Sequence, residues 1–188
     1  MNIGVFGSAF DPPTKGHLDV LRQAATLFDT ILLVPSAAHP FCKRSLSFDL
    51  RLQLLNAFVE DAGRLGPALE ISPIEAELLC ASVDRPVYTY DVLTALSDSY
   101  PQAKLTFIRG PDNAQESVWQ RFYRYRDIER QWSIFTAEEN CLVRSSHLRA
   151  LLGTVNTIAG AAQISRLLTP AVHNLIVTLS LYQRTKPI

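Results

Sequence analysis

Apolar residues along this chain alternate between two spacings. The run Asn2–Phe6 (N-I-G-V-F) is almost continuously apolar, as in a strand buried on both faces, and so is Thr30–Val34 (T-I-L-L-V). Between them, after Gly16, apolar residues recur at three- and four-residue intervals, which is typical of one face of a helix. A strand, a helix and a second buried strand indicate a parallel sheet with crossover helices.

The same alternation continues towards the C-terminus. Ser47 can cap a helix that runs to about Ala62, and Thr169-Pro170 can begin a last helix that ends near Leu181. Three more strands are expected, at Leu69–Ile74, Lys104–Arg109 and Ser133–Thr136, with a helix that starts near Thr89. We therefore predict a doubly wound α/β sheet of five or six mostly parallel strands with a small helical C-terminal part.

Composition limits the class of protein. The 188 residues have zero net charge, 47% hydrophobic and 19% charged residues, and no apolar run long enough for a membrane span. We expect one domain, with the sheet core over about 1–140 and a helical subdomain over about 141–188. Neither nucleic acid nor a membrane is an expected partner: the basic run Arg121–Arg130 contains two acidic residues and suits a solvated helix face. Three scattered cysteines and no visible signal peptide favour the cytoplasm.

The first strand leads into the most informative stretch, G-S-A-F-D-P-P-T-K-G-H over residues 7–17. The prolines end regular pairing, and the next helix starts among Thr14, Lys15 and His17. A helix N-terminus presents unpaired N–H groups and the positive end of its dipole, which suits a phosphate, and two basic side chains add to this.

This stretch resembles the nucleotide-binding signature of the nucleotidyltransferase superfamily, (T/H)-x-G-H after a first strand. The preceding G-x-F-D-P is similar to one branch, the nicotinate or nicotinamide mononucleotide adenylyltransferases. The resemblance implies that His17 and Thr14 are catalytic. It also implies nucleotide contacts at Gly7, Ser8, Phe10 and Lys15.

A second motif lies near the other end of the chain. L-V-R-S-S-H-L-R over residues 142–149 resembles the superfamily signature I-S-S-T-x-I-R, with Arg144 in place of a serine and Ser146 in place of a threonine. By this resemblance Ser145, Ser146 and Arg149 hold the β- and γ-phosphates of a nucleotide, with one of the serines capping the helix that carries Arg149.

Softer similarities lie between the two motifs. The family usually has a loop between its third strand and the next helix, so the resemblance implies a loop over Ile74–Arg85. V-Y-T-Y-D-V-L resembles the family's S-Y-T-x-D-T-L and implies that Thr89 lies near the pyridine carboxylate or amide, although it can also simply cap a helix. Gly110-Pro111-Asp112-Asn113 matches G-x-D-N, so Gly110 and Asp112 are expected at the ligand, although an Asp here is also an ordinary turn residue. Trp119 either stacks near the pyridine ring or is a half-buried core aromatic.

Two cations after the second strand allow alternative interpretations. Lys43, in the loop Ser36–Ser45, resembles a phosphate-contacting lysine, but cations on a solvated loop are common. Arg51 is expected to be solvent-facing or ion-paired.

The implied reaction transfers AMP from ATP to nicotinate mononucleotide, giving deamido-NAD and pyrophosphate. His17 would bind the α-phosphate, Thr14 would assist, and Arg149 with Ser146 would hold the pyrophosphate. Mg²⁺ is expected on the ATP phosphates, without a protein metal site. Two alternatives are a transferase that uses another acceptor such as phosphopantetheine, and a non-catalytic nucleotide sensor. The absence of G-x-G-x-x-G and of the Walker G-K-[ST] argues against a dehydrogenase or a P-loop enzyme.

Overall fold

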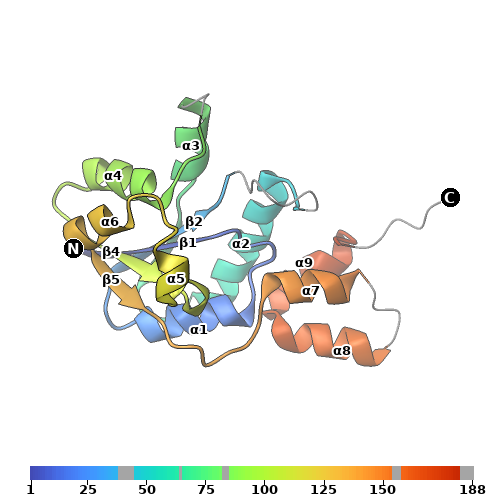
Figure 1. Cartoon of the computed structure of the whole chain (residues 1–188). Helices are drawn as coiled ribbons and strands as arrows, with labels where there is room; N and C mark the ends of the chain where they lie inside the picture. The colour runs from blue at the N-terminus through green and yellow to red at the C-terminus, as the bar shows by residue number, and fades with distance from the viewer. Residues whose placement is uncertain (38–44, 64, 82–84, 154–157, 183–188) are drawn as a thin grey trace.

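Five strands form one sheet in which neighbouring strands are parallel (Figure 1). The computed structural model describes residues 1–37, 45–63, 65–81, 85–153 and 158–182. The strand order is β3-β2-β1-β4-β5, with the bounds β1 Asn2–Ser8, β2 Thr30–Pro35, β3 Ala68–Ile71, β4 Lys104–Arg109 and β5 Ser133–Thr136. The predicted doubly wound, parallel α/β fold is confirmed.

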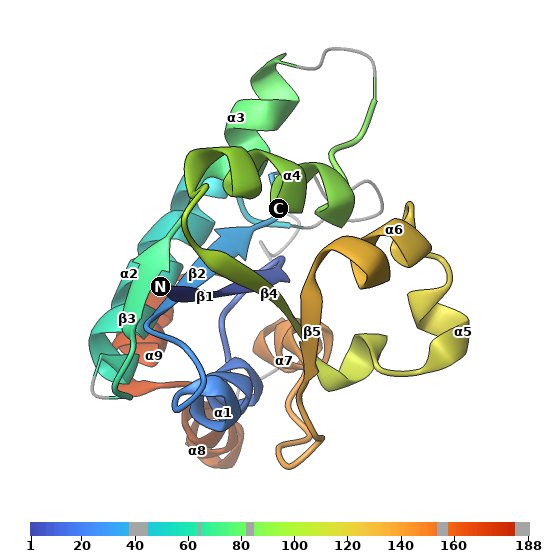
Figure 2. The same cartoon turned by 90° about the vertical axis from the view of Figure 1, so that its left-hand side faces the viewer.

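Helices cover both faces of the sheet, because the central strands are apolar on both sides. One face carries α1 (Lys15–Ala24), α2 (Phe48–Ala62), α7 (Ser145–Leu152), α8 (Ile158–Leu167) and α9 (Pro170–Thr178). The other carries α3 (Ile74–Ala81), α4 (Thr89–Ser99), α5 (Glu116–Trp119) and α6 (Tyr125–Gln131). Figure 2 shows α4 on one side of the sheet with α1 and α8 on the other.

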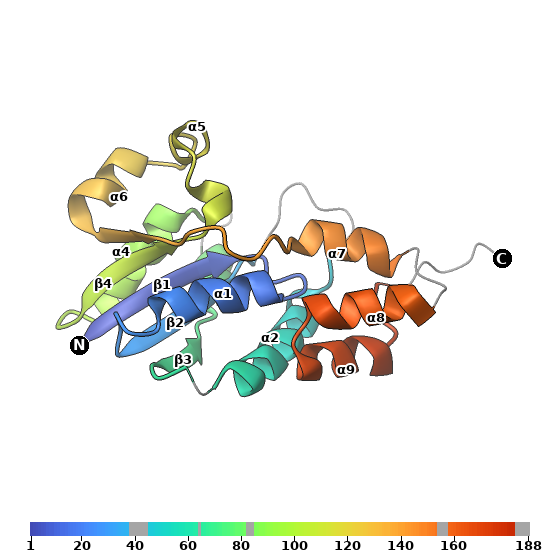
Figure 3. The ribbon, with the colours of Figure 1, turned by 90° about the horizontal axis from the view of Figure 1, so that it is seen from below.

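Alternate residues of β1 supply the two cores. Phe6 packs with α1, α2 and the C-terminal helices, whereas Ile3 and Val5 pack with α4 and with Trp119. Figure 3 shows α7, α8 and α9 together at one end of the molecule. Buried residues of these three helices belong to the same core cluster as the buried side of α2. The helices are therefore packed onto the sheet rather than separate from it.

Most predicted elements match the structure. The strands Lys104–Arg109 and Ser133–Thr136 and the helix that ends at Ala62 have the predicted bounds, and the Ser47 hydroxyl accepts the Leu50 N–H at 3.4 Å. The strand predicted over Leu69–Ile74 is shorter and lies at the sheet edge.

Four expectations at element ends or in loops are wrong or incomplete. The expected loop at Ile74–Arg85 begins with helix α3, because Ile74–Ala81 (I-E-A-E-L-L-C-A) contains no Gly or Pro that would prevent a helix. Helix α8 was not predicted. Within the basic run only the end is helical, in α6, and α9 ends at Thr178 rather than near Leu181.

The position of β1 determines where a ligand can bind. From β1 the chain passes through α1 to β2 on one side, while β4 lies against the other side of β1. At such a switch point the loops leaving adjacent strands diverge and open a crevice at their carboxyl ends. Within the described residues, no helix is long and apolar enough to cross a membrane.

Candidate active site

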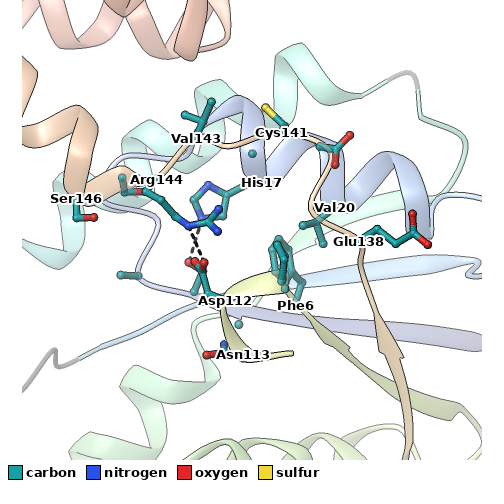
Figure 4. A pocket seen from close by; sticks show the side chains of 18 of the residues that line it. Phe6, His17, Val20, Asp112, Asn113, Glu138, Cys141, Val143, Arg144 and Ser146 are labelled. Carbon is teal, nitrogen blue, oxygen red and sulfur yellow. Dashed lines mark hydrogen bonds and ion pairs between the residues drawn. The ribbon is translucent and has the colours of Figure 1, made fainter. Parts of the chain in front are cut away.

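A cavity of about 300 Å³ opens at the carboxyl ends of β1 and β4, between the N-termini of α1 and α7 (Figure 4). It lies at the switch point and brings both sequence motifs together, although they are at opposite ends of the chain. The predicted site residues that line it are Gly7, Ser8, His17, Gly110, Asp112, Ser145, Ser146 and Arg149.

His17 is held in one orientation by its neighbours. The backbone N–H of Thr14 donates to His17 Nδ1 at 3.0 Å, and the Thr14 hydroxyl lies 3.0 Å from the same nitrogen. Since Nδ1 accepts, the proton of the neutral ring is on Nε2, which lies 3.0 Å from Ser8 Oγ at the cavity wall. Burial, reinforced by the positive charge of Arg144, lowers the pKa of His17 to about 4. At neutral pH His17 therefore offers an uncharged Nε2–H donor.

Phe10 and Thr14 lie behind His17 rather than at the cavity. Phe10 is fully buried, with its ring centroid 5.0 Å from the His17 ring and 5.6 Å from Phe6. Thr14 is also fully buried. Their side chains are buried against His17 and help to position it, and the roles predicted for Phe10 and Thr14 at the ligand stay predictions. Lys15 is partly exposed and does not line the cavity either.

Gly16 allows the two motifs to meet. A Cβ at this position would lie 2.6 Å from the carbonyl oxygen of Val143 and 3.5 Å from that of Cys141. A real Cβ does not approach a backbone oxygen so closely, and the segment leading into α7 can cross the start of α1 only over a glycine. This close approach explains why the third position of T-K-G-H is a glycine.

Asp11 joins the turn after β1 to three distant segments. Its buried carboxylate accepts hydrogen bonds from Ser45 Oγ at 2.8 Å and Tyr182 Oη at 2.6 Å. Arg149 Nη1 donates to the Asp11 backbone oxygen and lies 3.7 Å from Asp11 Oδ2. Burial and the adjacent carboxylate raise the pKa of Tyr182 above its usual range, so its hydroxyl remains a donor. The guanidinium of Arg149 is thus anchored beside the cavity.

The same turn is fastened by a buried arginine that sequence reasoning misplaced. Arg51 is only 3% exposed, and its guanidinium donates to the backbone oxygens of Ala9 at 2.9 Å and Leu46 at 3.3 Å. The expected solvent-facing or ion-paired arginine is instead a structural cation bound to carbonyl groups. Asp11 and Arg51 look like ordinary turn and helix residues in the sequence, because their partners are far away along the chain.

Arg144 spans the cavity from the start of α7. Its Nε lies 2.6 Å from Asp112 Oδ1, and its Nη2 also pairs with Glu139 Oε1. Figure 4 shows the Arg144 guanidinium meeting Asp112 beside His17. The sequence signal for this residue was its departure from the serine of the second motif.

Residues 5–151 match the family model described as cytidylyltransferase-like, which is more than half of the chain. The chain belongs to the cytidylyltransferase-like family. It is a nucleotidyltransferase, as predicted, and the resemblance to the mononucleotide adenylyltransferases is confirmed by its relatives.

Curated relatives of this family member have consistent names. A probable nicotinate-nucleotide adenylyltransferase of Maridesulfovibrio salexigens is 31% identical over 161 residues, which cover 82% of this chain and 70% of the relative. A protein of the same name from Pelodictyon phaeoclathratiforme is 28% identical and covers 97% of this chain and 92% of its own length.

Similar solved structures carry the same kind of name as the curated relatives. A putative nicotinate-nucleotide adenylyltransferase from Vibrio parahaemolyticus has a TM-score of 0.78 and 31% identity, with 98% of each chain covered. Nicotinic acid mononucleotide adenylyltransferase of Plasmodium falciparum, complexed with NaAD, has a TM-score of 0.69 and 18% identity, with coverage of 96% and 97%. At that identity the second likeness shows the fold alone.

The structure shows where two further predicted residues lie, Trp119 and Thr89. Trp119 is fully buried: its ring stacks on Phe107 with centroids 6.0 Å apart, and its Nε1 donates to Glu129 at 2.8 Å. It is a core residue here, because the second apolar cluster closes around it. Thr89 is partly exposed and outside the cavity wall. It is the first helical residue and not the cap, since Tyr88 is the N-cap of α4.

Two further predictions concern the cap of α7 and the side chain of Lys43. The N-cap of α7 is Arg144, so Ser145 and Ser146 are the first two helical residues. Ser145 Oγ donates to the Pro12 backbone oxygen at 2.8 Å, which ties α7 to the turn after β1. Lys43 lies outside the described residues.

The described residues include no cluster of three or more His, Cys, Asp or Glu side chains placed to hold a metal ion. The donors around the cavity are instead suited to anions: backbone N–H groups at two helix starts, hydroxyls and guanidiniums.

Proposed function

We propose that this nucleotidyltransferase transfers AMP from ATP to nicotinate mononucleotide, forming deamido-NAD and pyrophosphate. One observation carries the proposal: the starts of α1 and α7 share one cavity at the switch point, and both His17 and Arg149 line it. The names of the relatives support the choice of substrates.

The reaction requires no nucleophilic side chain. A phosphate oxygen of the mononucleotide attacks the α-phosphorus of ATP, and the bond from that phosphorus to the oxygen bridging to the β-phosphate breaks. The protein then contributes positioning and stabilisation of charge that develops on the phosphates. The Nε2–H of His17 is the proposed donor to an α-phosphate oxygen, and Thr14 keeps the proton on Nε2 by donating to Nδ1.

The second helix start is the proposed site for the leaving group. Arg149, held beside the cavity by Asp11, is the proposed guanidinium partner of the β- and γ-phosphates, and Ser145 and Ser146 supply backbone N–H groups at the start of α7. Mg²⁺ is proposed to arrive on the ATP phosphates and to neutralise part of their charge. Lys15 and Lys43 remain predicted phosphate contacts of secondary importance.

The mononucleotide is proposed to bind at the end of β4. A Cβ atom added at Gly110 would have no other atom within 4 Å, so the backbone there is open to a ligand. Asp112 can accept hydrogen bonds from ribose hydroxyls. Thr89 and neighbouring N–H groups remain the predicted contacts of the pyridine carboxylate.

Asp91, two residues after Thr89, is already paired with an arginine. Both of its oxygens accept from Arg85, at 2.8 and 2.9 Å, and this pairing holds the pKa of Asp91 below its usual range. A nicotinate carboxylate near Thr89 would therefore not face an unpaired negative charge, whose repulsion would favour the neutral nicotinamide.

Pyrophosphate release from ATP tests the proposal, with nicotinate mononucleotide, nicotinamide mononucleotide or phosphopantetheine as sole acceptor. We expect kcat/KM for nicotinate mononucleotide to exceed the other values at least tenfold, which corresponds to about 1.4 kcal/mol. A preference for nicotinamide mononucleotide would reverse the assignment of acceptor. Turnover with phosphopantetheine alone would indicate a sister transferase, and ATP binding without turnover would indicate a nucleotide sensor.

Three wider expectations stay predictions: a cytoplasmic location, a single domain with its helical subdomain over about 141–188, and the absence of a nucleic-acid partner. The ATP and mononucleotide partners are part of the proposal above.

A further inference from the structure

Arg144 is held at the cavity by two partners that face solvent. Its side chain is 35% exposed, that of Asp112 is 59% exposed and that of Glu139 is 40% exposed. Ion pairs of this exposure contribute only about 0–1 kcal/mol, because water and salt compete with them. The guanidinium can therefore change partners at little cost.

The charges of the cavity wall make such a change favourable. Among the described residues, three carboxylates line the cavity, from Asp19, Asp112 and Glu138, and two guanidiniums line it, from Arg144 and Arg149. Arg149 is already engaged by Asp11, whose carboxylate is 1% exposed. A triphosphate carries several negative charges, so a further cation close to the phosphates, in addition to Arg149 and the Mg²⁺ that accompanies ATP, favours its binding to this wall.

Arg144 has the position and the chemistry of that cation. It is the N-cap of α7, directly before the two serines proposed for the β- and γ-phosphates, and its charge acts on His17 beside the proposed α-phosphate position. A planar guanidinium binds phosphate through two parallel N–H donors, more strongly than it binds an exposed carboxylate. The family motif has a serine here, which lacks both the charge and the reach.

We propose that Arg144 is an additional phosphate-binding residue, an inference that rests on the proposed function. On ATP binding, Arg144 leaves Asp112 for the β- or γ-phosphate of ATP. Asp112 is then free to accept hydrogen bonds from the mononucleotide. Arg144 then links the two substrate positions. ATP binding removes the competitor from Asp112, and by thermodynamic reciprocity the mononucleotide strengthens ATP binding by the same factor.

The test measures equilibrium binding of α,β-methylene-ATP, a non-reacting analogue, and of nicotinate mononucleotide, each alone and with the other present. The variants are Arg144→Gln and Asp112→Asn. Arg130→Gln is the matched control, because Arg130 is an exposed arginine paired with Asp127 on α6, outside the cavity wall.

If Arg144 moves from Asp112 to the phosphate, replacing Arg144 and replacing Asp112 should have opposite effects on binding of the analogue. Arg144→Gln should weaken binding of the analogue about tenfold or more, since a charged hydrogen-bond donor is lost. Asp112→Asn should leave analogue binding unchanged or make it tighter, because Arg144 is released. The wild type should bind the mononucleotide more tightly when the analogue is present, and Arg144→Gln should remove this coupling while Arg130→Gln keeps it.

A merely structural ion pair would behave differently. Equal weakening of analogue binding by both variants, or less than a twofold effect of Arg144→Gln, would overturn the proposal. Unchanged coupling in Arg144→Gln would also overturn it. These measurements need no turnover: an inactive wild type would refute the proposed function, whereas analogue binding would still test the role of Arg144.

Discussion

Replacing His17 separates its role as a donor at the cavity from its contact with Thr14. In the wild type the Thr14 N–H donates to His17 Nδ1. In His17→Asn the side-chain amide oxygen can still accept this hydrogen bond, but the shorter side chain places no N–H group at the position of Nε2. In His17→Gln the longer amide carries an N–H donor close to the position of Nε2. His17→Ala removes both functions.

The structure sets the expected size of the effects. Loss of a preorganised donor to the developing phosphate charge costs about 10²–10³ in kcat, or about 2.7–4 kcal/mol. We expect that loss for both His17→Ala and His17→Asn. His17→Gln should lose only about tenfold, because its donor is present but no longer held by the Thr14 N–H.

The assay is pyrophosphate release at saturating ATP and nicotinate mononucleotide, with thermal unfolding of each variant measured in the same buffer. His173→Gln, on α9 and away from the cavity wall, is the matched control and should have wild-type kcat. Near-normal kcat in folded His17→Asn would refute the reasoning, since the Thr14 contact alone would then account for His17.

The same variants test the protonation state. Burial and Arg144 lower the pKa of His17 to about 4 in the folded protein, whereas an unfolded histidine titrates near 6.5. The folded state therefore resists protonation, so stability is complete above about pH 6.5 and falls as the pH drops towards 4. At pH 5 this linkage amounts to at most about 2 kcal/mol. Unfolding of His17→Gln should lack this pH-dependent loss, and equal pH profiles for the two proteins would contradict a neutral buried ring.

Three further predictions follow from the described contacts. Arg149→Lys should raise KM for ATP about tenfold with little change in mononucleotide affinity, because lysine lacks the planar fork; equal losses for both substrates would contradict its placement. Gly16→Ala should lower the unfolding temperature and the activity, since its Cβ would lie 2.6 Å from the Val143 oxygen, whereas Gly7→Ala, whose nearest contact is 3.9 Å away, should leave the unfolding temperature unchanged. Burial raises the pKa of Glu75 to about 7, so its ionisation lowers the stability of the protein as the pH rises from about 4.5 through 7. Glu75→Gln should therefore raise the free energy of unfolding by about 1–3 kcal/mol at pH 8 and change it little at pH 4.5. Denaturant titrations at the two pH values measure this difference.

The sequence by itself determined the elements whose signals are local. Continuous apolar runs predicted β1 and β2, and the hydroxyl of Ser47 predicted the start of α2, because burial on both faces and helix capping depend on residues close in the chain. It also determined the family, through T-K-G-H and S-S-x-L-R. Helix α3 was missed because eight residues with a weak apolar pattern fit a loop as well as a helix.

Only the tertiary structure decided which candidate residues meet a ligand. Trp119 and Phe10 have side chains that suit either a ligand or a core, and in the structure each belongs to an apolar cluster built from several elements. The bond from Arg149 to Asp11 spans 138 residues, and that from Ser145 to Pro12 spans 133. No local pattern contains such contacts. Arg144 shows the same limit: the sequence identified a departure from a motif, whereas the fold placed its charge across the cavity from Asp112.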